Sequence, residues 1–245
     1  MKKKNILIIG ARSDIATAIA NYFAKEDYNI QLAARNSSTL NKNKLDIESK
    51  YQTQVTLHNI DVLEISSFKQ FIDSLPQLPD IAVSAVGYMG EQQKSEKDLQ
   101  STIKIIRSNF EGPASIIGML ANNFEERGSG TLIGISSVAG ERGRGSNYIY
   151  GSAKAGFTTF LSGLRNRLMN KNVHVITVLP GFVATKMTNH LKLPSKLTAQ
   201  PNEVANAIFN AVRKKQNVIY VKSIWRLIMI IIKNIPEHFF KRMKL

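Results

Sequence analysis

The 245-residue sequence contains no cysteine. Disulfides, thiolate metal sites and cysteine nucleophiles are therefore excluded. Histidine is also scarce, and the spacing of metal ligands does not occur among the four positions, so we predict no metal site. These positions are His58, His174, His190 and His238.

Long apolar runs and flexible linkers are missing too. Residues 1–10, MKKKNILIIG, hold an apolar run of about five residues that ends at a glycine, which is too short for a signal peptide core. No Gly/Ser-rich or Pro-rich stretch divides the chain. We therefore expect one α/β domain that stays in the cytoplasm.

Acidic residues are few. The 18 Asp and Glu stand against 33 Lys and Arg, which gives a net charge of +15. Such an excess favours an anionic partner, and composition leaves nucleic acid, a membrane surface and a phosphorylated substrate open. A lysine-rich surface without any partner is the remaining alternative.

Strand-like and helix-like segments alternate along the chain. Continuous apolar stretches predict buried strands, and the segments between them predict helices, including one over roughly 95–126 and one after Tyr148. Repeated βα units of this kind predict a parallel sheet covered by helices on both faces, which is a doubly wound, Rossmann-type α/β fold. The expected strands are 5–10, 29–35, 56–62, 80–87, 131–137, 174–181 and 217–221.

Tyr150 and Lys154 lie four residues apart on the helix predicted after Tyr148, so both side chains should project from one face. A neighbouring ammonium favours the phenolate, and we expect it to lower the pKa of Tyr150 towards the working pH. A phenol of this kind is a general acid/base. Ser137 follows a predicted strand, and its hydroxyl could hold a substrate oxygen. Taken alone, a Tyr–Lys pair is more often surface decoration.

Further motifs accompany this pair. Asn109 lies 28 residues before Ser137, and Pro180–Gly181 end the next predicted strand. With these motifs in order, residues 4–222 resemble the short-chain dehydrogenase/reductase family. The resemblance implies an enzyme that transfers hydride between NAD(P)H and a carbonyl.

The resemblance also implies a role for each catalytic residue. Ser137 and Tyr150 would bind the carbonyl oxygen, and Tyr150 would give the proton. Lys154 would lower the pKa of Tyr150 and hold the ribose. Asn109 would anchor a water-linked proton path from Lys154.

The first βα turn, residues 10–16, should lie beside the ligand, because doubly wound sheets bind ligands across the carboxyl ends of their strands. Of the three glycines in the family pattern only Gly10 is present. Asp14 would repel a pyrophosphate unless its carboxylate turned away, and we interpret it as the cap of the following helix.

The second predicted strand ends in Arg35 and carries no acid there. An acid would hold the ribose 2′-hydroxyl of NAD, whereas an arginine accommodates the 2′-phosphate of NADP. Arg12 could reach the same phosphate. NADP(H) is therefore favoured, and NAD(H) is the alternative if Arg35 is an exposed loop charge.

Other cofactor contacts are implied by the resemblance. Asp61 matches an adenine contact, and Val183 and Thr185 match contacts to the nicotinamide carboxamide. Residues 85–87 read Ala-Val-Gly where the family has Asn-Ala-Gly, so only backbone contacts are expected there. The full expected set is Gly10, Arg12, Ser13, Asp14, Ile15, Arg35, Asp61, Val62, Ala85, Gly87, Tyr150, Lys154, Pro180, Gly181, Val183 and Thr185.

Residues 185–201 are expected to form a mobile lid, and residues 223–245 form a basic amphipathic tail. Lys233 and Pro236 interrupt the tail's apolar run, which is far shorter than the ~20 residues of a spanning helix. We expect the tail to lie in an anionic membrane interface, with Trp225 and the phenylalanines among the acyl chains. Packing of the tail on the domain or on a dimer partner is the alternative.

The tail and residues 181–187, GFVATKM, resemble the branch of the family that includes decaprenylphosphoryl-2-keto-ribose reductase. That resemblance implies a lipid-linked keto-sugar as substrate, at the inner face of the membrane. A second class of function is a nucleotide sensor or nucleic-acid-binding protein on the same fold. The intact catalytic residues favour an enzyme. No basic-aromatic RNA-binding module interrupts the chain, so we expect no nucleic-acid partner. We also expect a homo-oligomer.

Overall fold

The computed structural model describes residues 3–189 and 191–243. Across these residues, seven parallel strands form one sheet in the order β3-β2-β1-β4-β5-β6-β9. A short pair, β7 with β8, lies beside it. The order reverses between β1 and β4, as in a doubly wound sheet. The strands are β1 Asn5–Ile9, β2 Asn29–Ala34, β3 Val55–Asn59, β4 Ile81–Ser84, β5 Gly130–Ile135, β6 Val173–Pro180, β7 Phe182–Val183, β8 Thr198–Ala199 and β9 Val218–Val221.

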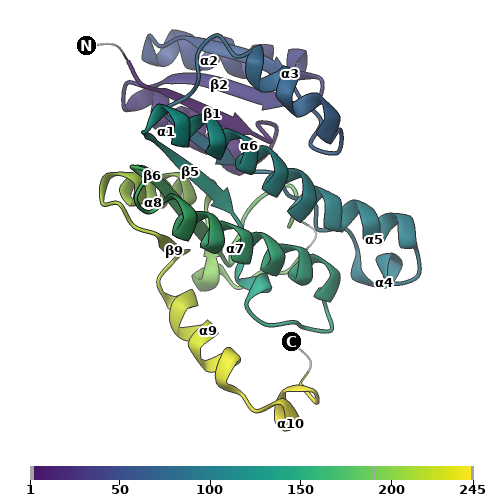
Figure 1. The fold of residues 1–245 in the computed structure, drawn as a ribbon. Helices are drawn as coiled ribbons and strands as arrows, with labels where there is room; N and C mark the ends of the chain where they lie inside the picture. The colour runs from purple at the N-terminus through teal and green to yellow at the C-terminus, as the bar shows by residue number, and fades with distance from the viewer. Residues whose placement is uncertain (1–2, 190, 244–245) are drawn as a thin grey trace.

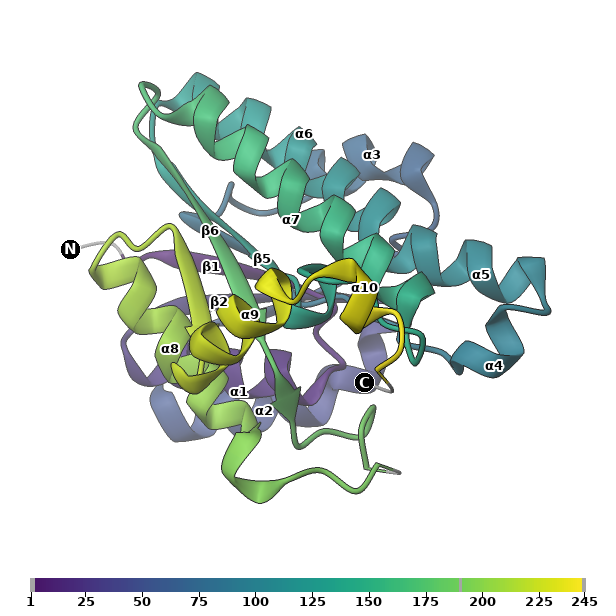
Figure 2. The same cartoon turned by 90° about the horizontal axis from the view of Figure 1, so that it is seen from below.

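Helices cover both faces of the sheet (Figures 1 and 2). One layer holds α1, α2 and α8, and the other holds α3, α6 and α7. The Rossmann-type fold and the single domain are thus confirmed. The helices of the two layers are α1 Asp14–Lys25, α2 Asn41–Tyr51, α3 Phe68–Asp73, α6 Gly112–Arg127, α7 Tyr148–Leu168 and α8 Pro201–Arg213.

The alternation of β1 divides the core into two halves. Ile6 and Ile8 pack with the apolar side chains of α1 and α8, whereas Leu7 and Ile9 pack with those of α6 and α7. All four side chains are fully buried. Because successive side chains of a strand point to opposite faces, one continuous apolar strand supplies both halves.

The single helix predicted over 95–126 is wrong in detail. The chain forms α4 (Gln92–Ser95), α5 (Leu99–Ile106), a π-helical turn (Arg107–Glu111) and then α6. The break before α5 has a local cause, because the Asp98 side chain accepts a hydrogen bond from the Gln100 backbone and caps the new helix. The π-helical turn carries Asn109.

The tail folds onto the domain. Helix α9 (Ile224–Asn234) buries Trp225 and Met229 against Val138 and Leu179, and the short α10 (Glu237–Phe240) follows it. Figure 1 shows both tail helices beyond β9, on the side of the domain away from α2 and α3. The sequence suggested that Trp225 lies among acyl chains, and the structure instead buries it in the domain. Its indole fills an apolar space that the domain already offers.

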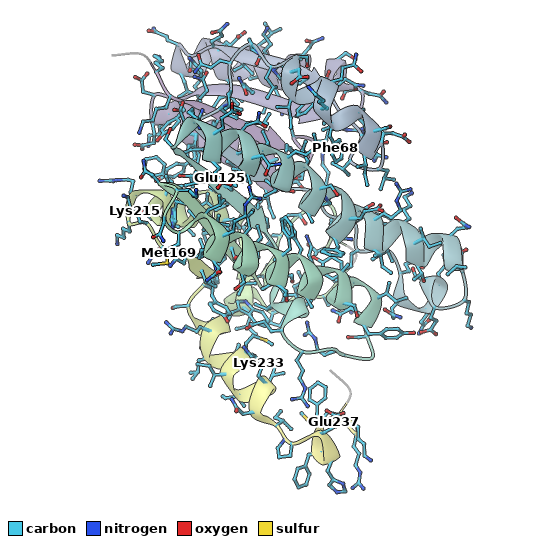
Figure 3. All side chains as sticks on the ribbon, viewed as in Figure 1. Phe68, Glu125, Met169, Lys215, Lys233 and Glu237 are labelled. Carbon is cyan, nitrogen blue, oxygen red and sulfur yellow. The ribbon has the colours of Figure 1, made fainter. Side chains whose placement is uncertain are left out.

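Polar contacts add to this packing. The Lys233 ammonium lies 3.0 Å from Glu141, and the Arg142 guanidinium lies 2.8 Å from Glu237. Figure 3 labels Lys233 and Glu237 on the tail. Both acidic–basic pairs connect the tail to the segment between β5 and α7, so they hold the end of α9 and the start of α10 against the domain. Within the described ranges, no helix is both long and apolar enough to cross a bilayer.

Candidate active site

One cavity of about 1180 Å³ opens at the carboxyl ends of the strands. It extends from the first βα turn, past Tyr150, to the tail helix α9. Every residue that the sequence assigned to the cofactor lines this cavity, and so do the catalytic candidates Ser137, Tyr150 and Lys154. Asn109 does not line it, because its side chain is completely buried. The structure thus brings the distant segments that the sequence assigned to the site together at one cavity.

Gly10 is required at the first βα turn. Its φ is +85°, and a Cβ at this position would lie 2.9 Å from the carbonyl carbon of Ala85. Any other residue would be strained and would also collide with the end of β4. The bare backbone leaves room for a ligand to approach the turn closely, which fits the pyrophosphate of a dinucleotide.

The interpretation of Asp14 as a helix cap is wrong. Ser13 caps α1, because its hydroxyl accepts a hydrogen bond from the Ala16 backbone. The Asp14 carboxylate instead accepts a hydrogen bond of 2.7 Å from the Lys186 backbone. The carboxylate is thus turned towards the predicted lid segment, and this contact joins the start of α1 to the residues that follow β7.

Arg35 and Asp61 lie together at the β2–β3 end of the cavity. The Arg35 guanidinium is 3.9 Å from the Asp61 carboxylate, and its side chain is 60% exposed. An ion pair this long and exposed contributes little stability. The Arg35 side chain is therefore available to an anionic ligand in the cavity, and Arg12 lines the same end.

Ser137 and Tyr150 meet in the middle of the cavity. Ser137 lies two residues after the end of β5. Its hydroxyl accepts a hydrogen bond of 3.1 Å from the Ala139 backbone. A side-chain hydrogen bond between Ser137 and the phenol of Tyr150 holds the two hydroxyls side by side. The Ser136 hydroxyl fixes the neighbouring turn of α7, because it donates to the Lys154 carbonyl at 2.9 Å. Two oxygen atoms from different elements thus face one point.

Lys154 lies under this pair and is 2% exposed. Its ammonium donates to the carbonyls of Ile135 at 3.0 Å and Val86 at 3.3 Å. It also lies 5.8 Å from the centre of the Tyr150 ring. The ammonium is therefore directed to the strand ends, which places a positive charge beside the phenol.

The expected lowering of the Tyr150 pKa is wrong for this structure. Burial raises the pKa of Tyr150 to about 12, and the hydrogen bond to Ser137 offsets only part of this increase. Burial also lowers the pKa of Lys154 to about 7. A lysine that is half neutral at pH 7 gives the phenolate little stabilisation, so desolvation outweighs the attraction between the two groups.

Asn109 has a structural task in the described residues. Its amide donates to the carbonyls of Tyr88 at 2.6 Å and Ile105 at 2.8 Å, and its oxygen accepts from the Tyr88 backbone at 3.1 Å. These bonds fix the turn after β4, which reads Ala85-Val86-Gly87. Asn109 therefore positions this turn from below. The proton path that the resemblance implied for Asn109 stays a prediction.

Several residues of the cavity were not found from the sequence. Trp225 lines the cavity beside Gly181. Its indole packs so closely on the glycine that a Cβ on residue 181 would lie only 1.9 Å from it. Arg144 and Asn147 come from the loop before α7 and also line the cavity. Their signal was available in the basic segment ERGRGSN, residues 141–147, which directly precedes the Tyr–Lys motif.

Comparisons with known proteins agree with this geometry. Residues 4–195 match the family model described as short chain dehydrogenase. An uncharacterised oxidoreductase of Mycobacterium tuberculosis is 30% identical over 241 residues, which cover 97% of this chain and 96% of that protein. An NADP-dependent 3-hydroxy acid dehydrogenase of Schizosaccharomyces pombe is 27% identical, over 88% of this chain and 89% of that protein.

The fold also matches solved structures. A short-chain dehydrogenase of Sphingobium yanoikuyae in complex with NADPH is 18% identical and gives a TM-score of 0.79, over 96% of this chain and 97% of that one. The family match spans most of the chain, and the motif residues Ser137, Tyr150 and Lys154 meet at one cavity. This chain belongs to the short-chain dehydrogenase/reductase family and is an NAD(P)-dependent oxidoreductase.

Proposed function

We propose that this enzyme reduces a carbonyl group to a secondary alcohol, with Tyr150 as the proton donor. The observation that carries the proposal is the meeting of the Tyr150 and Ser137 hydroxyls above the Lys154 ammonium in one cavity. Because the pKa of Tyr150 is about 12, the phenol keeps its proton at neutral pH. A carbonyl oxygen held by the two hydroxyls can receive that proton in the transition state.

NADP(H) is the proposed cofactor, and NAD(H) is the alternative. The open backbone at Gly10 accommodates the pyrophosphate, and the exposed guanidinium of Arg35, with Arg12, suits a 2′-phosphate. The bound nicotinamide supplies the hydride. The NADPH of the Sphingobium structure and the name of the Schizosaccharomyces relative agree with this choice.

We propose that Lys154 binds the ribose of the cofactor, in addition to placing a positive charge beside Tyr150. Its ammonium is already directed to the strand ends at Ile135 and Val86, and the family resemblance implies that Lys154 holds the ribose of the cofactor. A ribose hydroxyl there would replace lost hydration and raise the lysine's pKa. A fully charged Lys154 would then lower the pKa of Tyr150. Asn109 keeps the Val86 carbonyl in place through the Tyr88 backbone.

We further propose an amphiphilic substrate, of which a lipid-linked keto-sugar is one example, and attachment to an anionic membrane surface through α9 and α10. The buried face of α9 packs on the domain, but Leu227, Ile230 and Ile231 on its other side are each more than half exposed. Phe239 in α10 is 61% exposed. Between residues 213 and 245 the chain has nine Lys and Arg and one acid, which suits anionic headgroups. Lys244 and Leu245 lie outside the described residues.

A turnover screen tests the proposed function. Purified enzyme is mixed with NADPH or NADH and with a panel of soluble ketones, 3-oxo acids and keto-sugar lipids, and loss of absorbance at the nicotinamide band is recorded. We expect turnover of at least one amphiphilic ketone, with NADPH preferred. The absence of turnover in all classes, or equal rates in the Tyr150→Phe variant, contradicts the proposal.

Two other expectations also stay predictions. A homo-oligomer is expected, and light scattering at several concentrations would give its mass. Location in the cytoplasm, peripheral to the membrane, is expected, and fractionation of cells into supernatant and membrane pellet would measure it.

A further inference from the structure

Arg144 differs from several other arginines of the protein. Arg107, Arg142 and Arg167 each form an ion pair with a glutamate, and Arg127 and Arg165 donate to backbone carbonyls. Among the described residues, no acid forms an ion pair with Arg144, and its buried Nε has no hydrogen-bond partner. Glu141, three residues away, is engaged by Tyr220 and Lys233 through Oε1, and its Oε2 is buried without a hydrogen-bond partner in the described part of the chain.

Arg144 also has a defined place in the cavity. It lies in the turn that leads into α7, where the Asn147 backbone donates to its carbonyl at 3.1 Å. It therefore precedes Tyr150 by six residues and lines the same cavity from the β5–β6 side of the sheet. Arg12 and Arg35, which we assign to the cofactor, line the opposite side next to β1 and β2. Arg144 is thus on the side left for the substrate.

The wall around Arg144 has no acid. Asp14 and Asp61 are the acidic residues that line the described cavity, and both lie at the cofactor side, engaged by the Lys186 and Leu63 backbones. Apolar side chains make up much of the remaining wall. They are Met89, Met187, Leu191, Leu193 and Trp225. An unpaired guanidinium with an apolar surround fits a ligand that combines an oxyanion with a hydrocarbon body.

We propose that Arg144 forms an anion-binding subsite, so that the carbonyl compound reduced at Tyr150 carries a carboxylate or phosphate on an apolar body. The inference rests on the proposed reductase function. The planar guanidinium would donate hydrogen bonds to two oxygens of the anion side by side. The Asn147 side-chain oxygen, which is buried without a partner among the residues described, could accept a hydrogen bond from a hydroxyl group of the same ligand.

Binding measurements test this subsite without any need for turnover. Trp225 is the sole tryptophan of the sequence and lines the cavity, so its fluorescence reports occupancy. The full-length enzyme, saturated with NADP⁺, is titrated with octanoate against octanamide and with octyl phosphate against 1-octanol. Isothermal titration calorimetry on the same samples provides a second readout. The two pairs distinguish a carboxylate from a phosphate.

We expect wild-type enzyme to bind at least one anion roughly 10-fold or more tightly than its neutral partner, as for a charge-assisted contact. Arg144→Gln should remove this preference and leave the neutral ligand unchanged, and Arg144→Lys should restore part of it. Lys192→Gln removes a cation from another part of the same wall and should retain the preference. Equal loss in Lys192→Gln would assign the effect to the overall positive charge and overturn the subsite.

The proposal is also overturned if wild-type enzyme binds neither anion or if Arg144→Gln keeps the preference. Thermal unfolding with and without NADP⁺ checks that the variant is folded, and we expect no loss of stability because, among the described residues, the Arg144 Nε has no hydrogen-bond partner and no acid pairs with the guanidinium. A lower unfolding temperature would indicate a structural role instead. Failure of the reductase function would appear separately, as absent turnover in the carbonyl screen while the anion preference persists.

Discussion

The ammonium of Lys154 donates to the carbonyl of Ile135 at 3.0 Å, and the lysine is only 2% exposed. This contact draws the charge towards the end of β5. Burial lowers the pKa of this lysine to about 7, well below that of an exposed lysine. We therefore expect the protonation of Lys154 to depend on what occupies the cavity.

Stability of the ligand-free enzyme should rise between pH 7 and about 10. In this window the unfolded chain keeps the Lys154 proton and the folded chain has lost it, so the unfolded state binds more protons and the free energy of unfolding increases with pH. Above pH 10 the unfolded chain loses the Tyr150 proton first, and stability falls again. Urea unfolding at several pH values measures both slopes.

The matching variants separate this effect from the other lysines. Lys154→Met should remove the rise between pH 7 and 10, which is expected to be on the order of a few kcal/mol. Lys97→Met, at an exposed position, should keep it. A flat profile in the wild-type protein would show that Lys154 remains charged when buried.

Tyr150→Phe should lower turnover by at least ~10², because it removes the proton donor and leaves the ring in place. NADPH affinity should change little. Tyr148→Phe is the matched control, since Tyr148 begins the same helix but is 44% exposed and outside the cavity. Steady-state kinetics and NADPH titration measure both quantities, and retained turnover in Tyr150→Phe would refute the role of the phenol.

Arg35→Ala should weaken NADPH binding by about 10-fold to 100-fold and NADH binding much less, because the guanidinium would lose a charge-assisted bond to the 2′-phosphate. The Arg12→Ala/Arg35→Ala double variant should lose most of the remaining preference. Lys25→Ala, at the exposed end of α1, is the control for net charge. Equal losses for the two nucleotides in Arg35→Ala would assign this residue to the surface.

Sedimentation with vesicles tests the tail. The triple change Leu227→Gln, Ile230→Gln and Ile231→Gln removes the exposed apolar face of α9 and keeps its buried residues. It should abolish binding to vesicles that contain anionic lipid. The matched control changes Leu45, Leu99 and Met169, which are at least as exposed but lie elsewhere (Figure 3 labels Met169). High salt should weaken wild-type binding only in part.

Binding that survives the α9 triple change, or that the control variant loses equally, would contradict attachment through the tail. Truncation after Lys222 is a poorer test, because it would also remove Trp225 from the cavity wall. A loss of activity on a membrane-bound substrate could then come from lost membrane binding or from a damaged active site.

Gly181→Ala should destabilise the protein by roughly 1–3 kcal/mol, as expected when a packed contact becomes overfilled. The new methyl would meet the Trp225 indole, and α9 would have to shift. Trp225→Leu should relieve the collision, so the double variant should be less destabilised than the sum of the two single variants. Chemical unfolding of all four proteins measures this coupling, and simple additivity would show that the tail moves freely.

The sequence predicted most of the fold and the location of the site. Buried parallel strands appear as continuous apolar runs, so β1, β2 and β6 could be recognised directly. Tyr150 and Lys154 are adjacent on a helix, which makes their pairing visible in the sequence. The cavity follows from the strand order, because the ends of parallel strands meet at one edge.

Other features depend on contacts that no local pattern reveals. The Asp14 carboxylate could have capped α1, and only the approach of Lys186, 172 residues later, decides against this. The pKa of Tyr150 depends on the amount of water that the whole fold excludes. Trp225 has the character of a membrane anchor, and its burial is explained by the missing side chain at Gly181.

The π-helical turn at Arg107–Glu111 also has a consequence for the length of the chain. A π-helical turn contains one residue more than the α-helical turn it replaces, and each α-helical residue rotates the chain by about 100°. The extra residue therefore determines which face of α6 is directed into the core, relative to the face that α5 directs to the cavity. We therefore expect an inserted residue to be tolerated better in the turn at 96–98 than between Ile105 and Asn109, where the Asn109 amide is bonded to the Ile105 and Tyr88 backbones.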